Sequence, residues 1–227
     1  MEIKFYNRKA KVLETEKVYG DKAMKLMYES KLGQFFANIL SHSPLSLIYG
    51  HIQSSSIFSK RKIKPFISDF SINMEDYLPE EGFSAEAPYP HFNSFFIRRF
   101  KAGRRPFALA PQMGAFAEAR YYAYESVQPD NLIPVKGKFL SPEVILDNPK
   151  WNETFKDGPL LLARLCPVDY HRYHFPDNGR VIDQYTISGA LHSVNPIALQ
   201  AIPSILCQNE RQVAILETEN LGKLAYI

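Results

Sequence analysis

The chain has 227 residues, of which 45% are hydrophobic and 22% are charged, with a formal net charge of +3. This composition is that of an ordinary globular protein, and it excludes collagen-like, low-complexity and wholly disordered chains. The 16 prolines and the 13% aromatic content favour a turn-rich chain with many strands. Cys166 and Cys207 have no CxxC spacing, so we expect small buried residues of a reducing compartment rather than a disulfide or a zinc knuckle.

Positive charge is concentrated in residues 1–64, which contain twelve Lys or Arg and five acidic residues. Within this segment apolar residues recur at steps of three and four, which predicts an amphipathic helix beginning near Asp21. The residues of its apolar face are Met24, Tyr28, Leu32, Phe35, Phe36 and Ile39. A second apolar stretch at 45–52 and a basic run at 60–64 follow.

A basic amphipathic segment of this kind binds anionic membrane surfaces by burying its apolar face and attracting the headgroups. A helix packed on its own core, with a solvated basic side, fits the same pattern and is favoured when these residues are taken alone. Nucleic acid is not an expected partner, because the basic residues lack interleaved aromatics. No secretory signal is expected, and no window reaches the roughly 18 apolar residues of a spanning helix.

Residues 69–90 are rich in acidic residues, Pro and Gly, which is typical of a linker or surface loop. Beyond them, strands are expected at 120–127, 131–135, 179–188 and 212–216. Helices are expected at 92–99, with Asn93 as the N-cap, and at 141–146. We therefore expect an α+β fold with a basic, membrane-associating helical region at 1–68, a linker at 69–90 and a strand-rich catalytic scaffold at 91–227.

Titratable side chains are concentrated in residues 165–179, in a turn or at the start of a helix. His171 and His174 lie three residues apart, and the other members of the cluster are Asp169, Tyr170 and Arg172. Their density supports general acid–base chemistry, because imidazole gains and loses a proton near neutral pH. The histidines also fit half a metal site with Glu118 as a distant third ligand, or a polar turn held by hydrogen bonds.

The segment Asp169–Pro176, with Gly179, resembles the Asp-Tyr-His-Arg-x-His-x-Pro-x-x-Gly signature of phosphatidylserine decarboxylases. Four other blocks resemble elements of the same family, and all five are found in residues 92 to 211. The other blocks are Phe92–Arg99 with Arg105-Pro106, Val135-Lys136-Gly137 with Ser141 and Leu146, His192–Pro196, and Asn209–Arg211. Agreement of five ordered blocks by chance is negligible.

The resemblance implies a pyruvoyl-dependent carboxy-lyase of phospholipid biosynthesis that converts phosphatidylserine to phosphatidylethanolamine and CO2. In this family a proenzyme cleaves itself before a serine, which becomes the pyruvoyl group of a small C-terminal α subunit. The carbonyl of that group forms a Schiff base with the substrate amine and accepts electrons as CO2 leaves. The resemblance also implies peripheral association with an anionic phospholipid membrane on its cytoplasmic side, and it allows a homodimer.

The roles of individual residues follow from the same resemblance. His174 would be the base that activates the cleaving serine, and His171 would hold the substrate carboxylate or deliver a proton during turnover. Glu118 stands where most members have an aspartate that orients the cleavage base, and its side chain is one methylene longer. The expected substrate-binding residues are Tyr170, Arg172, Phe95 and Phe96, and no metal ligands are expected.

The family's cleavage motif contains a Gly-Ser pair, but none of the 11 glycines of these 227 residues is followed by serine. We therefore expect the pyruvoyl group on a C-terminal segment beyond Ile227, and we expect the chain to be inactive without it. Two alternatives stay open. One is a family member acting on a soluble amine such as an aromatic amino acid, and the other is a non-catalytic, membrane-binding remnant of the scaffold.

Overall fold

The computed structural model describes residues 3–16, 21–42, 48, 50–52, 54–55, 59–126, 141–202 and 204–227. The strand expected at 131–135, the Lys136-Gly137 pair and much of the apolar stretch at 45–52 lie outside the described residues. The side chain of Met24 in the predicted apolar face also lies outside them.

The N-terminal region begins with an antiparallel hairpin formed by β1 (Lys4–Asn7) and β2 (Val12–Thr15), which the sequence analysis did not predict. The helix predicted to begin near Asp21 does so, but it is divided into α1 (Asp21–Tyr28) and α2 (Lys31–His42). The division occurs because Ser30 caps α2, its Oγ accepting a hydrogen bond from the Gly33 N–H at 3.0 Å. A Cβ at Gly33 would lie 2.4 Å from the Leu26 carbonyl oxygen, so this tight helix pair requires glycine.

The next block of the chain combines short helices with a two-stranded pair, β3 (Tyr77–Leu78) and β4 (Arg99–Phe100). Its helical elements are the 3-10 helices η1 (Lys60–Lys62) and η2 (Met74–Asp76), α5 (Ile63–Phe70) and α6 (Phe92–Phe96). Ile63, Phe66, Tyr89 and Phe95 form its buried core. The prediction of Asn93 as the N-cap was wrong, because His91 caps α6 by accepting the Ser94 N–H at Nδ1.

The remainder of the chain contains most of the strands, as expected. β5 (Arg120–Tyr124) pairs with β6 (Leu160–Arg164), and an antiparallel sheet has the order β7 (Gly179–Ile187), β8 (Arg211–Thr218), β9 (Lys223–Tyr226). The helices here are α7 (Pro142–Leu146), α8 (Pro149–Phe155), α9 (Pro196–Ala201) and α10 (Ile205–Gln208). The α+β expectation is confirmed, although β6, β9, α8, α9 and α10 were not predicted.

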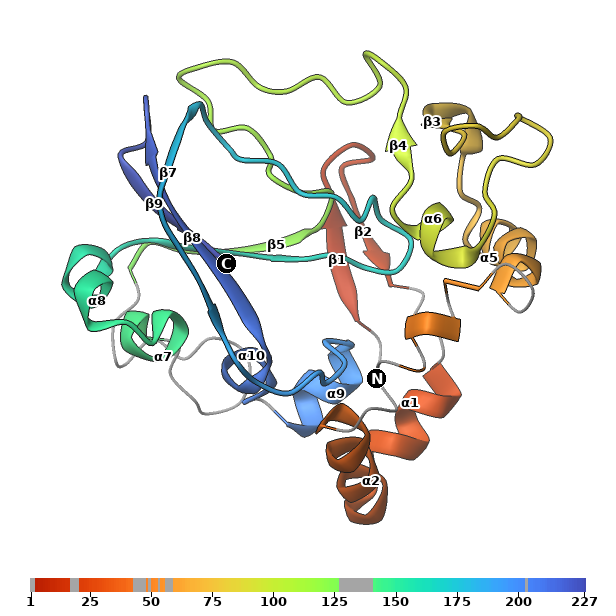
Figure 1. Ribbon diagram of the computed structural model, residues 1–227, viewed down its shortest axis with the longest axis horizontal. Helices are drawn as coiled ribbons and strands as arrows, with labels where there is room; N and C mark the ends of the chain where they lie inside the picture. Colours follow the sequence, from red (N-terminus) through yellow and green to blue (C-terminus); the bar gives the residue numbers. More distant parts are fainter. Residues whose placement is uncertain are drawn as a thin grey trace.

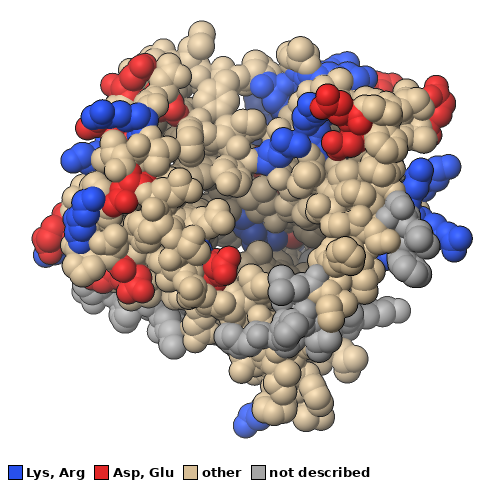
Figure 2. Space-filling view, in the orientation of Figure 1, with Lys and Arg blue, Asp and Glu red and all other residues tan. Residues whose placement is uncertain are grey.

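Figure 1 shows the sheet of β7, β8 and β9 on one side of the molecule, with α7 and α8 beside it, and the α5–α6 block on the opposite side. Leu146 and Trp151 from α7 and α8 pack against Val213 and Ile215 of β8. The hairpin of β1 and β2 lies between the two sides, and α1 and α2 project below it (Figure 1). The face shown in Figure 2 is hollowed near its middle, between these two sides.

The projecting helices use one face for packing. Tyr28 of α1 and Ala37 of α2 are buried against Ala198 of α9 and Ile205 of α10. Leu26, Leu32 and Phe35 remain 77%, 68% and 60% exposed. The interpretation as a helix packed on its own core therefore holds for one face of the helix pair, while apolar side chains of another face stay exposed. None of the helices that the structure describes has both the length and the apolar character to span a membrane.

Candidate active site

The segment with the two histidines joins β6 to β7 and begins with a tight turn rather than a helix. The Asp169 N–H donates to the Cys166 carbonyl at 2.8 Å, and the Cys166 N–H donates to Asp169 Oδ2 at 2.7 Å. Further along, Tyr173 pairs with Ala117 in an antiparallel bridge, and the His174 N–H donates to the Phe116 carbonyl. These bonds fix the backbone on both sides of the histidines.

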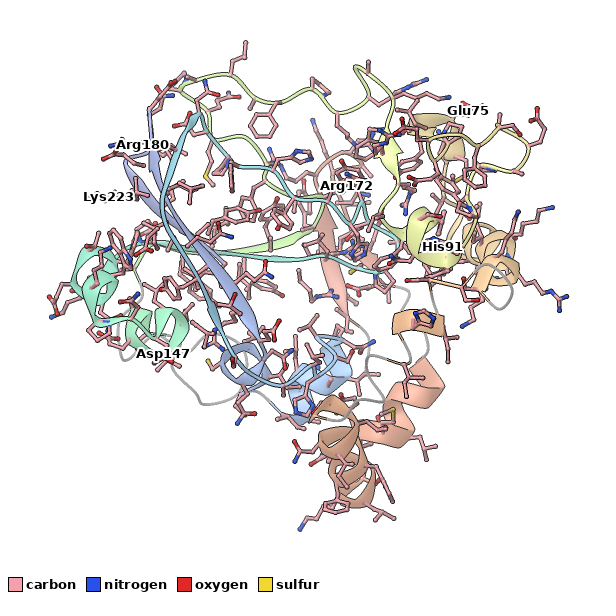
Figure 3. All side chains as sticks on the ribbon, in the orientation of Figure 1. Glu75, His91, Asp147, Arg172, Arg180 and Lys223 are labelled. Carbon is pink, nitrogen blue, oxygen red and sulfur yellow. The ribbon has the colours of Figure 1, made fainter. Side chains whose placement is uncertain are left out.

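Both histidines line one cavity of about 390 Å³. Its wall is formed by Ile97 at the end of α6 and by Tyr170, His171, Arg172, Tyr173 and His174. Arg172 lies near the middle of the molecule in Figure 3, and its Nε donates to the Ile97 carbonyl at 2.7 Å. The structure therefore brings both imidazoles to the same cavity.

His171 is the more enclosed of the two imidazoles. Its ring stacks on Phe96 with a centroid distance of 3.8 Å, and its Nε2 lies 2.8 Å from the Cys166 carbonyl oxygen. Burial lowers the pKa of His171, because the charged imidazolium loses hydration. The hydrogen bond to Cys166 and the charge of Asp169 oppose this lowering of the pKa, and the charge of Arg98 adds to it.

His174 is exposed at the cavity. Its ring is nearly parallel to that of Tyr170, with a centroid distance of 5.8 Å and an interplanar angle of 4°. The ring centroid of Phe107 lies 6.5 Å away, and the two planes meet at 67°. The ring is therefore oriented by aromatic neighbours while remaining accessible to a group brought from another part of the protein.

Glu118 lies next to the bridge between Ala117 and Tyr173, so its segment runs beside that of His174. Its Oε1 is paired with Arg105 Nη2 at 3.2 Å, and its carboxylate does not form a hydrogen bond with His174. Its Oε2 is buried and has no hydrogen-bond partner among the residues that the structure describes. Within these residues, no three His, Cys, Asp or Glu side chains are grouped as a metal site would require.

The four expected substrate-binding residues fall into two groups. Tyr170 and Arg172 line the cavity, and Phe96 lies behind it as the stacking partner of His171. Phe95 is 0% exposed and packs in the core with Phe66 and Tyr89, so it is not accessible to a ligand. The assignment of Phe95 to the lipid site is therefore corrected to a core position.

Two arginines that were not predicted as site residues, buried Arg98 and partly buried Arg120, bind the turn that precedes the histidines. Arg98 is 1% exposed and donates from Nη2 to the Val168 carbonyl at 2.9 Å and to the Asp169 carbonyl at 3.3 Å. Arg120 Nη1 lies 2.6 Å from both carboxylate oxygens of Asp169. Arg98 belongs to the Phe92–Arg99 block, which was the one sequence signal that could have identified it.

A third unpredicted contribution comes from Glu16, which follows β2. Its side chain is 4% exposed and forms ion pairs with Arg164 and, at 3.7 Å, with Arg120. The Cys166 thiol donates to Glu16 Oε1 at 3.1 Å, and burial raises the pKa of that thiol to about 12. Cys166 is therefore a structural thiol rather than a nucleophile. Cys207 is only partly buried, which differs from the expectation of two buried cysteines.

The C-terminal strand β9 ends beside the histidine segment. The Tyr226 ring packs against Phe116, Tyr173 and Phe175, with centroid distances of 5.5, 5.6 and 5.7 Å. Figure 1 places the C-terminus near the middle of the molecule.

A family model described as phosphatidylserine decarboxylase matches residues 92–227. Among similar proteins, the phosphatidylserine decarboxylase proenzyme of Clostridium tetani is 37% identical, and the match covers 99% of this chain and 74% of the relative. The proenzyme of Clostridium novyi is 36% identical, with coverage of 99% and 75%. That of Clostridium perfringens is 35% identical with the same coverage.

Proposed function

The chain belongs to the phosphatidylserine decarboxylase family, and from this premise we propose that it decarboxylates phosphatidylserine to phosphatidylethanolamine at the cavity of His171 and His174. The observation that carries this proposal is that two imidazoles in different environments line one cavity, His171 enclosed and His174 exposed. Distinct environments suit distinct proton-transfer roles.

We assign to His174 the proton-accepting step of self-cleavage. Its exposed ring is available to the hydroxyl of a serine on a further segment, and its backbone is fixed by the bond to Phe116. Glu118 is assigned the orientation of this imidazole. Its buried Oε2 has no partner among the described residues, so it is the carboxylate atom open to a ring N–H.

His171 is assigned to turnover. An imidazole whose pKa is lowered by burial is a stronger acid once protonated, which suits delivery of a proton to the substrate carbon. Arg172 uses Nε for the Ile97 carbonyl, and its two terminal nitrogens make no hydrogen bond to the residues that the structure describes. These nitrogens are proposed to bind the carboxylate or phosphate of the headgroup.

The residues present fit a pyruvoyl group on a segment beyond Ile227, the C-terminal α subunit of the processed protein. The fit rests on the unpartnered Glu118 Oε2, the exposed His174 ring and the position of Tyr226 beside Tyr173. When bound, the group supplies a carbonyl that withdraws electrons as CO2 leaves. Around it, this chain's residues bind the headgroup, move protons and shape the cavity.

For the lipid substrate, we propose that α1 and α2 dock on the surface of an anionic membrane, on its cytoplasmic side. Their outer face presents Leu26, Leu32, Phe35, Phe36, Ile39 and Leu40, which are 39–77% exposed. Lys31 lies at the start of α2 and adds positive charge. Apolar burial combined with attraction to anionic headgroups is the usual basis of such peripheral binding.

The proposal is tested with the complete gene product, which includes any residues beyond Ile227. The purified protein is incubated with vesicles carrying phosphatidylserine labelled at its carboxyl carbon, and in parallel with aromatic amino acids labelled likewise. We expect labelled CO2 and phosphatidylethanolamine from the vesicles only. Release of CO2 only from an amino acid, or from neither substrate, would overturn the proposal.

A further inference from the structure

The hydrogen bond between His171 and Cys166 determines which nitrogen of the ring carries the proton. A carbonyl oxygen can only accept, so Nε2 must donate across the 2.8 Å to the Cys166 oxygen. In the neutral ring the proton is then on Nε2, and the lone pair is on Nδ1. Nδ1 has no hydrogen-bond partner among the described side chains and backbone groups, and the ring lines the cavity.

Cys166 is itself held at three points. Its carbonyl bonds His171, its N–H donates to Asp169 Oδ2, and its thiol contacts Glu16 Oε1. Asp169 is in turn held by both 2.6 Å contacts to Arg120. The Cys166 carbonyl that accepts from His171 is therefore held in place by the bonds of the Cys166 N–H and thiol.

Glu16 is the point where this network reaches the N-terminal hairpin. Its carboxylate pairs with Arg164 and Arg120 and contacts the Cys166 thiol. With a side chain only 4% exposed, it supplies negative charge between two arginines that would otherwise be buried without full compensation. Glu16 lies far outside the matched family region of residues 92–227, so the motif blocks do not include it.

We propose that Glu16 is a positioning residue for His171: through Arg120, Asp169 and Cys166 it holds the carbonyl that keeps the His171 proton on Nε2 and presents Nδ1 to the substrate. The role of Nδ1 in turnover rests on the proposed function, but the tautomer of the ring and its dependence on Glu16 can be measured without substrate. The charged groups facing the ring are Asp169 and Arg98, and its aromatic neighbour is Phe96.

The arrangement gives the two ring nitrogens different tasks. Nε2 keeps its proton in both charge states, because it donates to Cys166 whether the ring is neutral or protonated. The proton that is gained and lost is therefore the one on Nδ1. A ring that rotated or changed tautomer would lose this distinction, because the proton gained and lost would no longer be the one on Nδ1.

The test measures the nitrogen-15 chemical shifts of the His171 ring by NMR of the 227-residue chain. The His171 resonances are identified as those that are missing from the spectrum of His171→Gln. At a pH where the ring is neutral, we expect Nε2 to resonate as a protonated nitrogen and Nδ1 as an unprotonated one. Glu16→Gln keeps the size of the side chain but removes its charge, and we expect loss of this single-tautomer signature. Glu14→Gln in β2 is the matched control and should leave the signature intact, because the Glu14 carboxylate accepts a hydrogen bond from Asn7 across the hairpin and contacts none of the groups that the structure describes around His171.

A proton on Nδ1 in the unsubstituted chain would overturn the inference. An unchanged signature in a folded Glu16→Gln, judged by a dispersed amide spectrum, would overturn the part assigned to Glu16. Should Glu16→Gln fail to fold, Asp169→Asn removes the charge that pairs with Arg120 on the same route, and an unchanged signature there would overturn the route from Glu16 to Cys166. Absence of decarboxylase activity with the expected tautomer would reject the proposed function and leave this arrangement standing.

Discussion

Arg120 and Asp169 form a largely buried ion pair in which one guanidinium nitrogen lies 2.6 Å from both carboxylate oxygens. Arg120 begins β5, and Asp169 closes the turn that leads to His171. The pair therefore joins the β5–β6 ribbon to the histidine segment, and both side chains are largely hidden from water, at 18% and 10% exposed.

We predict that Arg120→Leu lowers the free energy of unfolding by about 3–5 kcal/mol, because it leaves Asp169 and Glu16 buried without their shared cation. Urea unfolding followed by circular dichroism measures the loss. Arg180→Leu is the control, because its pair with Glu217 has an arginine side chain that is 77% exposed, and its removal should cost about 0–1 kcal/mol. Equal losses in the two variants would contradict a structural role for the Arg120–Asp169 pair.

In the complete gene product, His174→Ala is predicted to block self-cleavage, because the serine hydroxyl loses its proton acceptor. His171→Ala is predicted to cleave normally but to lose about 10²–10⁴ in turnover, which is the usual effect of removing a positioned acid or base. Gel electrophoresis of the purified proteins separates uncleaved from cleaved chains. Normal cleavage by His174→Ala would refute the assignment of the base.

The pH dependence of stability follows from His171. The pKa of His171 lies below its ordinary value of 6.5 in the folded protein, because burial disfavours the charged ring. Between the folded and unfolded values of this pKa the unfolded chain binds more protons, so stability falls as the pH drops below 6.5. We predict that unfolding free energy declines more steeply in the wild type than in His171→Gln between about pH 7.5 and about pH 5.5.

Glu16 contributes in a different pH window. Burial alone would raise the pKa of Glu16, but hydrogen bonds from Arg164 and Cys166 and the charges of both arginines lower it on balance. Its stabilising effect is therefore lost only as the pH falls below its ordinary value of 4.5. This window lies below that of His171, so the two effects can be separated. If the unfolding free energy of the wild type and of His171→Gln changed equally with pH between about pH 7.5 and about pH 5.5, His171 would not be buried as described.

Membrane docking is predicted to depend on the outer face of α2. The double variant Phe35→Ser/Phe36→Ser should bind anionic vesicles at least about tenfold more weakly, a change of about 1.4 kcal/mol, because two phenyl groups no longer enter the lipid. Their 60% and 53% exposure means that the fold should be unaffected. Vesicle sedimentation measures the binding.

Tyr122→Ser provides the comparison for this measurement, since Tyr122 on β5 is also 53% exposed but lies on a different element. Equal binding by the double variant and the wild type would contradict the proposal that α2 contacts the membrane. Loss of a dimer by the same double variant in analytical ultracentrifugation would assign the face to a second copy of the chain instead.

The sequence predicted those elements whose signals are local. Alternation and turn residues identified β7 and β8, and Ser141-Pro142 identified the start of α7. The four-residue strands β1, β2 and β9 are too short to give a clear alternation, so only their partners define them. The apolar face at 24–39 was predicted as one helix because the three- and four-residue spacing continues across the break at Ser30.

The same limit applies to the candidate site. His171 and His174 were identified because their segment is continuous in sequence, and the cavity is lined mainly by that segment. Arg98, Arg120 and Glu16 act on partners 70, 49 and 150 residues away, and no local pattern reveals these contacts, although the Phe92–Arg99 block includes Arg98. The adjacency of Glu118 and His174 came from the resemblance to the family and depends on pairing between distant segments.

The double link between α6 and the histidine segment has a consequence for the energetics of catalysis. Arg98, two residues after the end of α6, donates to the carbonyls of Val168 and Asp169, while Arg172 donates back to the carbonyl of Ile97. The Phe96 ring lies between these hydrogen bonds and stacks on His171, so the cavity wall behind His171 is already formed in the absence of lipid. Binding energy from the headgroup therefore need not be spent on ordering that wall, and more of it is left to lower the barrier to carbon–carbon bond cleavage.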